Sequence, residues 1–145
     1  MKHKSFSILG YLILVMVLLE LLARDSLLAV GPVFITIQGL AASLMIWARI
    51  TFGQRSFHLS SEPTEGGLIT TGPYKYIRHP IYAAIIYFIS ASVLTHLSLV
   101  NISLWAAFCI GAGIRIYSEE TLLKQKYPGY GDYAKQTKRI IPFLI

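Results

Sequence analysis

Four mostly apolar stretches divide the chain, and polar segments separate them. They cover residues 6–23, 30–48, 81–100 and 102–114. A helix that crosses a bilayer needs about 20 apolar residues, with a range of about 17–25. The first three stretches reach that length, whereas the fourth reaches it only if Arg115 snorkels or faces protein. The pattern predicts an all-α protein, an integral membrane bundle of about four transmembrane helices with a cytosolic helical segment at the C-terminal end.

The ends of these stretches refine the prediction. The short segment THLSLVN, residues 95–101, forms the junction of the third and fourth stretches, which favours an antiparallel helical hairpin; a pair of re-entrant helices is the alternative. The N-terminal stretch has a basic start, but no cleavage motif of small residues follows it. We therefore expect a retained first span rather than a signal peptide. Glu20 interrupts this span, and the sequence assigns it no role.

Composition supports a membrane protein of one domain, residues 1–145. Hydrophobic residues make up 54% of the chain and charged residues 14%, against about 25% charged residues in soluble domains. Cys109 is the one cysteine, so a disulfide framework and a cysteine-based metal site are excluded.

The net charge of +6 comes from basic residues whose positions depend on the order of the spans. With four spans, every Lys and Arg except Arg24 falls on one side of the membrane, and cytoplasmic segments carry the Lys/Arg excess. We therefore expect both termini and the central loop in the cytoplasm. The charge indicates orientation and contact with membrane lipids rather than nucleic-acid binding.

The central loop, residues 51–79, exceeds the length of about 12–15 residues beyond which loops are commonly functional or disordered. Turn residues at Gly66-Gly67 and Gly72-Pro73 punctuate it, and it ends with Tyr74 and Tyr76. We expect an ordered lid.

After the fourth stretch, a helix is expected to continue towards Pro128-Gly129, which ends it. Ile116, Glu120, Leu123 and Tyr127 share one face of that helix. A carboxylate in such an apolar stripe is costly unless it is paired, so Glu120 needs a partner.

Two further spacings concern the same helix. Arg115 and Glu119 lie four residues apart and are expected to pair. Gly111 and Gly113 form a G-x-G pattern within an apolar helix, which indicates helix packing rather than dinucleotide binding.

The polar groups Arg78, His79 and Glu120 and several tyrosines all reach the same membrane face. Each has a structural alternative: Pro80 at the start of a helix, an interfacial arginine, an aromatic belt. Their joint placement instead favours one pocket for a zwitterionic or cationic ligand. The spacing of His and carboxylate residues does not suit a metal, and no Ser-His-Asp or Cys-His arrangement stands out in the sequence.

Three motifs together resemble the isoprenylcysteine carboxyl methyltransferase family, which is related to phospholipid N-methyltransferases. They are GPY-x-x-x-RHP-x-Y over residues 72–82, EE-x-x-L over 119–123, and Y-P-G-Y-x-x-Y with R-x-x-P over 127–142. The motif-bearing core covers about residues 66–142. These motifs are specific for the superfamily and much less so for the substrate.

The resemblance implies a helical membrane enzyme that holds S-adenosylmethionine on the cytosolic side, with a lipophilic or lipidated substrate entering from the bilayer. By motif match, Glu120 with Glu119 would bind the ammonium group of the cofactor. The implied cofactor-binding residues are Tyr74, His79, Pro80, Tyr82, Glu119, Glu120, Tyr130, Tyr133 and Arg139. The implied catalytic residues are Arg78, His79 and Glu119, and no metal site is expected.

The family favours O-methylation of an isoprenylcysteine-type carboxylate. The small number of spans resembles a minimal, prokaryotic member in the inner or plasma membrane, so the acceptor stays open. A phospholipid amine or a small thiol would need a base such as His79 or Glu119, whereas a carboxylate would not. Two further hypotheses are a sterol-reductase-like membrane oxidoreductase that uses NADPH and a non-catalytic membrane protein that keeps the fold.

Overall fold

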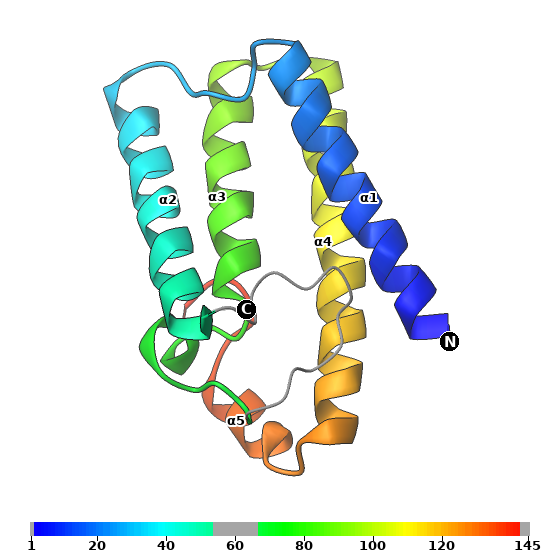
Figure 1. Ribbon diagram of the computed structural model, residues 1–145. Coiled ribbons are helices and arrows are strands. Elements are labelled where there is room, and N and C mark those ends of the chain that lie inside the picture. Colours follow the sequence, from blue (N-terminus) through cyan, green and yellow to red (C-terminus); the bar gives the residue numbers. More distant parts are fainter. Residues whose placement is uncertain (1, 54–66, 143–145) are drawn as a thin grey trace.

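The computed structural model describes residues 2–53 and 67–142, with side chains from Phe6 onward (Figure 1). Helices dominate the described residues, which hold no strand beyond a single parallel bridge between Ile77 and Lys138. The predicted all-α class is confirmed. In chain order the elements are α1 (Lys2–Ala23), α2 (Pro32–Phe52), the short 3-10 helix η2 (Gly72–Lys75), α3 (Pro80–Thr95), α4 (Leu99–Lys126) and α5 (Tyr130–Gln136).

Among the described residues, three helices are long and apolar enough to span a membrane: α1, α2 and α4. α3 is apolar but has only 16 residues. The prediction of a full third span over residues 81–100 and a short fourth one was therefore wrong in its lengths. α3 ends at Thr95 and α4 runs for 28 residues, because Ser98 caps α4 by accepting a hydrogen bond from the Asn101 backbone N–H at 3.1 Å.

Helices α1 to α4 form a bundle in which α1 packs along α4 and α2 along α3 (Figure 1). Successive helices run in opposite directions. The start of α1, the end of α2, the start of α3 and the end of α4 therefore lie at one end of the bundle, together with α5. The turn that contains Arg24 lies at the other end. This alternation agrees with the predicted distribution of basic residues.

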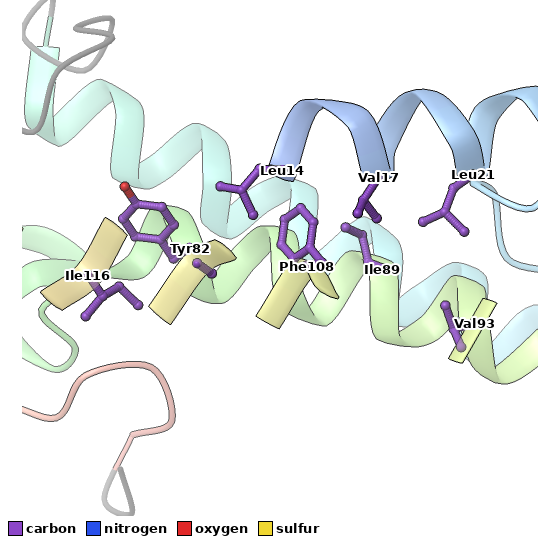
Figure 2. Close-up of a cluster of buried hydrophobic side chains, with 9 residues drawn as sticks. Leu14, Val17, Leu21, Tyr82, Ile89, Val93, Phe108 and Ile116 are labelled. Carbon is purple, nitrogen blue, oxygen red and sulfur yellow. The ribbon is translucent and has the colours of Figure 1, made fainter. Parts of the chain in front are cut away.

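The core lies where α1, α3 and α4 meet (Figure 2). Many large apolar side chains outside it, such as Leu19, Leu40 and Ile110, are exposed on the surface of the bundle, as expected for helices surrounded by lipid. The core residues are Leu14, Val17, Leu21, Tyr82, Ile89, Val93, Phe108, Ala112 and Ile116.

Glycine sets the close approach of α1 to α4. A Cβ atom on Gly10 would lie 2.9 Å from the carbonyl oxygen of Gly111 and 2.9 Å from the Arg115 Cγ. A Cβ atom on Gly111 would lie 3.0 Å from the Ile13 Cγ2. The packing role predicted for Gly111 is therefore confirmed, whereas a Cβ atom on Gly113 would meet nothing within 4 Å, so Gly113 is not needed for a close approach.

A polar network at the far end of the bundle was not predicted. The buried Gln38 of α2 donates a hydrogen bond to the Ser92 hydroxyl of α3 at 2.7 Å and another to the Leu27 carbonyl at 3.1 Å. Its own oxygen accepts one from the Ala29 N–H at 2.9 Å. Gln38 of α2 thus links the turn after α1 to α2 and to α3.

Glu20, which the sequence left unassigned, lies near the same end. It forms an exposed ion pair with Arg24, whose Nε lies 2.7 Å from the Glu20 Oε1. The carboxylate that interrupts the first apolar stretch therefore has a local partner four residues further on.

Residues 54–66 of the central loop that we predicted to be an ordered lid lie outside the described residues. Its last part packs against the end of α2. Gly72 has φ of 56°, and a Cβ atom there would lie 2.6 Å from the Thr51 hydroxyl oxygen. The Tyr74 ring lies 5.6 Å from the Phe52 ring. These contacts fix the segment that leads into Arg78 and His79.

Candidate active site

Backbone hydrogen bonds join the start of α3 to the C-terminal tail. The Arg78 N–H donates to the Lys138 carbonyl at 2.6 Å, and the His79 N–H donates to the Arg139 carbonyl at 3.0 Å. The Lys138 N–H returns a bond to the Tyr76 carbonyl at 3.2 Å. Pro80 follows at the first position of α3, where its missing N–H costs nothing. Two segments that are distant in sequence are thereby held side by side.

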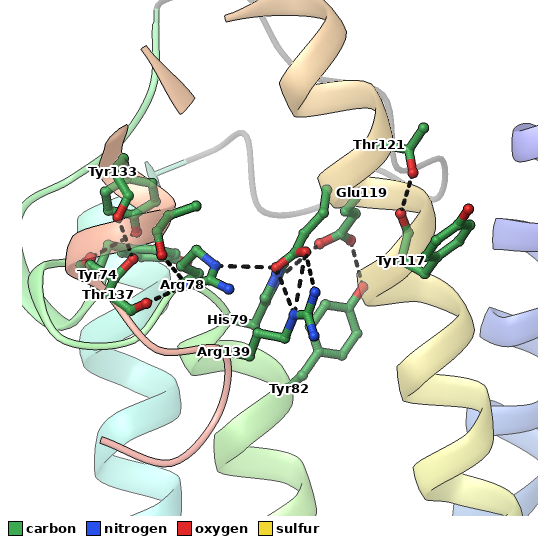
Figure 3. Close-up of polar contacts among 12 residues, drawn as sticks. Tyr74, Arg78, His79, Tyr82, Tyr117, Glu119, Thr121, Tyr133, Thr137 and Arg139 are labelled. Atoms are coloured by element: carbon green, nitrogen blue, oxygen red, sulfur yellow. Dashed lines mark hydrogen bonds and ion pairs between the residues drawn. The ribbon is translucent and has the colours of Figure 1, made fainter. Parts of the chain in front are cut away.

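Glu120 contacts three of the polar side chains at this end of the bundle, Arg78, His79 and Arg139, which Figure 3 shows close together. Its buried carboxylate accepts hydrogen bonds from the Arg78 Nε at 3.1 Å and from the Arg139 Nη2 at 3.0 Å. The His79 Nε2 lies 3.3 Å from the Oε1 of the same carboxylate. Glu120, which lies on an apolar helix face and therefore needs a partner, finds its partners at the start of α3 and in the C-terminal tail.

Glu119 has a different set of partners. It accepts a hydrogen bond from the Tyr82 hydroxyl at 2.5 Å, and its Oε2 lies 3.5 Å from the His79 Nδ1. The Arg115 Nη2 lies 3.8 Å from its Oε1, which confirms the pair predicted from the spacing of four residues. Arg115 also donates to the Tyr82 hydroxyl at 2.7 Å, so these groups form one connected network.

The buried His79 imidazole bridges the two carboxylates. Burial, the largest single effect, lowers the pKa of His79, but the hydrogen bonds and negative charges of Glu119 and Glu120 outweigh it. The pKa of His79 is therefore raised above its ordinary value of 6.5. The protonated imidazole, which can donate from both ring nitrogens, persists to higher pH than in a free histidine.

Arg78 extends the network to α5. Its Nη1 donates to the Ala134 carbonyl at 2.9 Å and to the Thr137 carbonyl as well. On the same side, the Tyr133 hydroxyl donates to the Tyr74 carbonyl at 2.7 Å. Burial raises the pKa of Tyr133 to about 12, so this hydroxyl stays a donor at ordinary pH.

Tyr130 carries an unused polar atom beside these charges. Its side chain is only 1% exposed, and its hydroxyl has no hydrogen-bond partner among the described residues. Burial, followed by the negative charge of Glu120, raises the pKa of Tyr130, whereas the charge of Arg78 lowers it. A buried hydroxyl without a partner is costly.

The comparison with known families agrees with these motifs. Residues 32–125, from the start of α2 almost to the end of α4, match the isoprenylcysteine carboxyl methyltransferase (ICMT) family. The chain belongs to this family. The family takes its name from a methyltransferase activity on isoprenylcysteine carboxyl groups. The match begins before the first motif, so α2 belongs to the family region as well.

Two curated relatives add to the comparison. The nickel-cobalt-cadmium resistance protein NccN of Alcaligenes xylosoxydans xylosoxydans is 33% identical over 78 residues, which are 53% of this chain and 37% of the relative. The cobalt-zinc-cadmium resistance protein CzcN of Cupriavidus metallidurans is 27% identical over 116 residues, 79% of this chain and 52% of the relative. The chain therefore spans about half the length of these relatives or less. No solved structure matches it.

The structure brings the motif residues of this ICMT-family chain together in two groups. One group contains the residues joined by direct polar contacts of the side chains. These are Arg78, His79, Tyr82, Glu119, Glu120 and Arg139. The second group flanks the first. The Tyr133 hydroxyl donates to the Tyr74 backbone carbonyl, Tyr130 lies beside Arg78 and Glu120, and the buried Pro80 begins α3.

Arg115 has a larger place in the site than sequence reasoning gave it. It is buried rather than snorkelling, and it donates to the Ser7 carbonyl of α1 at 3.2 Å. The Tyr11 ring lies below its guanidinium, with 5.4 Å from the ring centroid to Cζ. The spacing of four residues predicted the contact of Arg115 with Glu119. The contact with α1 depends on packing that no local pattern reveals.

Proposed function

We propose that this protein transfers a methyl group from S-adenosylmethionine to a lipophilic acceptor at the membrane surface. The observation that carries the proposal is the meeting of the two family motifs: Glu119 and Glu120 of α4 bond to Arg78, His79 and Tyr82 at the start of α3. In this proposal, these side chains together form the methyl-transfer site at one end of the bundle.

The depth of the site fits an interfacial reaction. With a rise of 1.5 Å per residue, Glu119 lies about 30 Å along α4 from Leu99, and the hydrocarbon core of a bilayer is also about 30 Å thick. The carboxylates therefore reach the level of the lipid headgroups. We place this end in the cytoplasm, in accord with the positive-inside rule, and expect the acceptor to enter from the lipid.

The residues present fit an S-adenosylmethionine-like cofactor. Glu120 and Glu119 offer carboxylates for its ammonium group, and the Tyr130 hydroxyl lacks a partner among the described residues. Tyrosine rings suit a sulfonium centre, because their faces attract cations. When bound, the cofactor supplies an activated methyl group. The protein then has to align donor and acceptor, which alone lowers a barrier by several kcal/mol.

The charges of the site favour a carboxylate acceptor over an amine. Among the described residues of the network, the guanidinium groups of Arg78, Arg115 and Arg139 outnumber the two carboxylates, even before His79 is protonated. His79 bridges both glutamates, which makes it a poor general base near neutral pH. A carboxylate needs no proton removed. We therefore propose isoprenylcysteine carboxylate-type O-methylation, with phospholipid amines and small thiols as alternative acceptors.

The names of the two relatives refer to metal resistance, and no observation favours a metal-binding role as a second candidate for this chain. Within residues 2–53 and 67–142, no group of three or more His, Cys, Asp or Glu side chains is arranged to hold an ion.

Ligand binding tests the cofactor first. The detergent-purified protein should gain melting temperature with S-adenosylmethionine and not with NADPH. A gain with NADPH alone would favour a sterol-reductase-like oxidoreductase, and no gain with either would favour a non-catalytic membrane protein.

Transfer of a labelled methyl group then tests the acceptor. We expect label on a prenylated cysteine with a free carboxylate, and little on a phospholipid amine or a small thiol. Label recovered mainly on the amine or the thiol would reject the carboxylate, and a lipid extract would extend the search.

A further inference from the structure

We propose that Glu120 is an exchangeable cation site, in which the Arg139 side chain holds the place that the ammonium group of the cofactor takes on binding. Arg139 then competes with the cofactor and sets its affinity, instead of helping to hold it. This inference rests on the proposed function, because it requires a ligand with an ammonium group.

The hydrogen-bonding capacity of Glu120 is already filled. A carboxylate offers about four lone-pair sites on its two oxygens. The Oε1 lies within 3.3 Å of the Arg78 Nε, the His79 Nε2 and the Arg139 Nε. The Oε2 accepts from Arg139, at 3.0 Å from Nη2 and 3.3 Å from Nε. An ammonium group can therefore reach the Oε2 only when Arg139 withdraws.

Of the three cationic partners, Arg139 can leave most easily. Its side chain is 52% exposed, against 11% for Arg78 and 5% for His79. An exposed guanidinium that loses its partner is solvated by water, so the loss is small. A buried cation would be left without compensation. Arg78 is further held by two backbone carbonyls and His79 by Glu119.

The exchange needs only the side chain of Arg139 to move. Its backbone carbonyl accepts from the His79 N–H at 3.0 Å, and the neighbouring Ile140 carbonyl accepts from the Tyr87 hydroxyl at 2.7 Å. Neither bond involves the guanidinium. The tail thus stays joined to α3 while Arg139 turns towards solvent.

Binding of S-adenosylhomocysteine to the protein, measured by calorimetry, tests the inference without turnover. This probe keeps the ammonium group but has no methyl group to transfer. Arg139→Ala should bind it roughly 2- to 5-fold more tightly than the wild type, the range expected when an exposed ion pair no longer competes. Lys138→Ala, which removes the same charge from the neighbouring exposed side chain, should leave the affinity unchanged.

An analogue of the probe without its α-amino group provides a second arm. It cannot replace Arg139 at Glu120, so wild type and Arg139→Ala should bind it equally. Arg139→Gln should fall between wild type and Arg139→Ala with the amino-bearing probe, and it serves as the test if the alanine variant does not fold.

The outcomes separate the inference from the proposed function. Weaker or unchanged binding by Arg139→Ala, with a wild type that binds, would overturn the exchange at Glu120 and leave the methyltransferase proposal intact. If Lys138→Ala binds the probe as tightly as Arg139→Ala does, the gain in affinity comes from the lower overall charge. That result would also overturn the exchange at Glu120. A wild type that binds neither S-adenosylmethionine nor S-adenosylhomocysteine would reject the proposed function, and the inference with it.

Discussion

At the scale of single residues, the site is a set of charges that depend on one another. Glu120 is buried against three cationic groups, and Glu119 binds Tyr82 and Arg115. Removing one member of a buried pair leaves its partner uncompensated, which is why such changes cost far more than a surface ion pair. Predictions at this scale concern both chemistry and stability.

Glu120→Gln and His79→Ala should each abolish methyl transfer while expression in the membrane persists. Glu120→Gln should also lower the free energy of unfolding by about 3–5 kcal/mol, because Arg78 and His79 lose a buried counter-charge. Transfer of labelled methyl groups and thermal unfolding measure the two effects. Turnover near that of the wild type in either variant would show that the site is assigned wrongly.

Stability should depend on pH through His79. Because the pKa of His79 is raised in the folded protein, its contribution is fully present below the unfolded value of 6.5. That contribution is lost as the pH rises through the folded value. The difference in melting temperature between wild type and His79→Gln should therefore be largest at about pH 6 and shrink towards pH 9. A difference that stays constant, or grows with pH, would contradict the assigned protonation of His79.

At the scale of elements, the packing of the helices in pairs positions the residues of the site. α4 supplies both glutamates, and its contact with α1 brings Arg115 against the Ser7 carbonyl and close to Gly10. The family match begins at residue 32, so α1 supports Arg115 from outside the matched region. α1 is thus part of the framework of the site and more than a membrane anchor.

Gly10→Ala should destabilise the protein by about 1–3 kcal/mol, because the added methyl group meets the Gly111 carbonyl and the Arg115 Cγ at 2.9 Å. Gly39→Ala and Gly113→Ala are matched controls, since a Cβ atom has no neighbour within 4 Å at either position. Both should be neutral or slightly stabilising. Thermal unfolding in detergent compares the three variants, and equal effects would contradict the close packing of α1 on α4.

At the scale of the whole molecule, the alternation of four helices puts the polar network and the start of α1 at the same end of the bundle (Figure 1). The turn with Arg24 and the Gln38 network occupy the opposite end. One face of the membrane should therefore carry all of the proposed chemistry.

Labelling of single cysteines should reveal this polarity. In a Cys109→Ser background, Lys138→Cys should react with a membrane-impermeant thiol reagent only after the cell is opened, and the exposed Val30→Cys should react in intact cells. The reverse pattern would invert the proposed orientation. Reaction of both positions from one side would contradict the three crossings, by α2, α3 and α4, that lie between them.

Much of this architecture was readable in the sequence because its signals are local. Apolar length predicted helices in a membrane, the spacing of four residues predicted the Arg115–Glu119 pair, and the cost of burying a carboxylate predicted that Glu120 has partners. Motif order predicted that the segment around His79 and the helix bearing Glu120 belong to one site. Each of these inferences needs only the composition of one segment and the physics of its surroundings.

Tertiary structure decided what depends on contacts between distant segments. The division of residues 81–126 into a 16-residue α3 and a 28-residue α4 depends on the cap at Ser98, and the burial of Arg115 depends on α1 packing through Gly10. The links of Gln38 to two other segments and of Arg139 to Glu120 likewise have no local signature. A hydrogen bond forms only where the fold brings its two atoms within about 3 Å, and no pattern along a single segment specifies that distance.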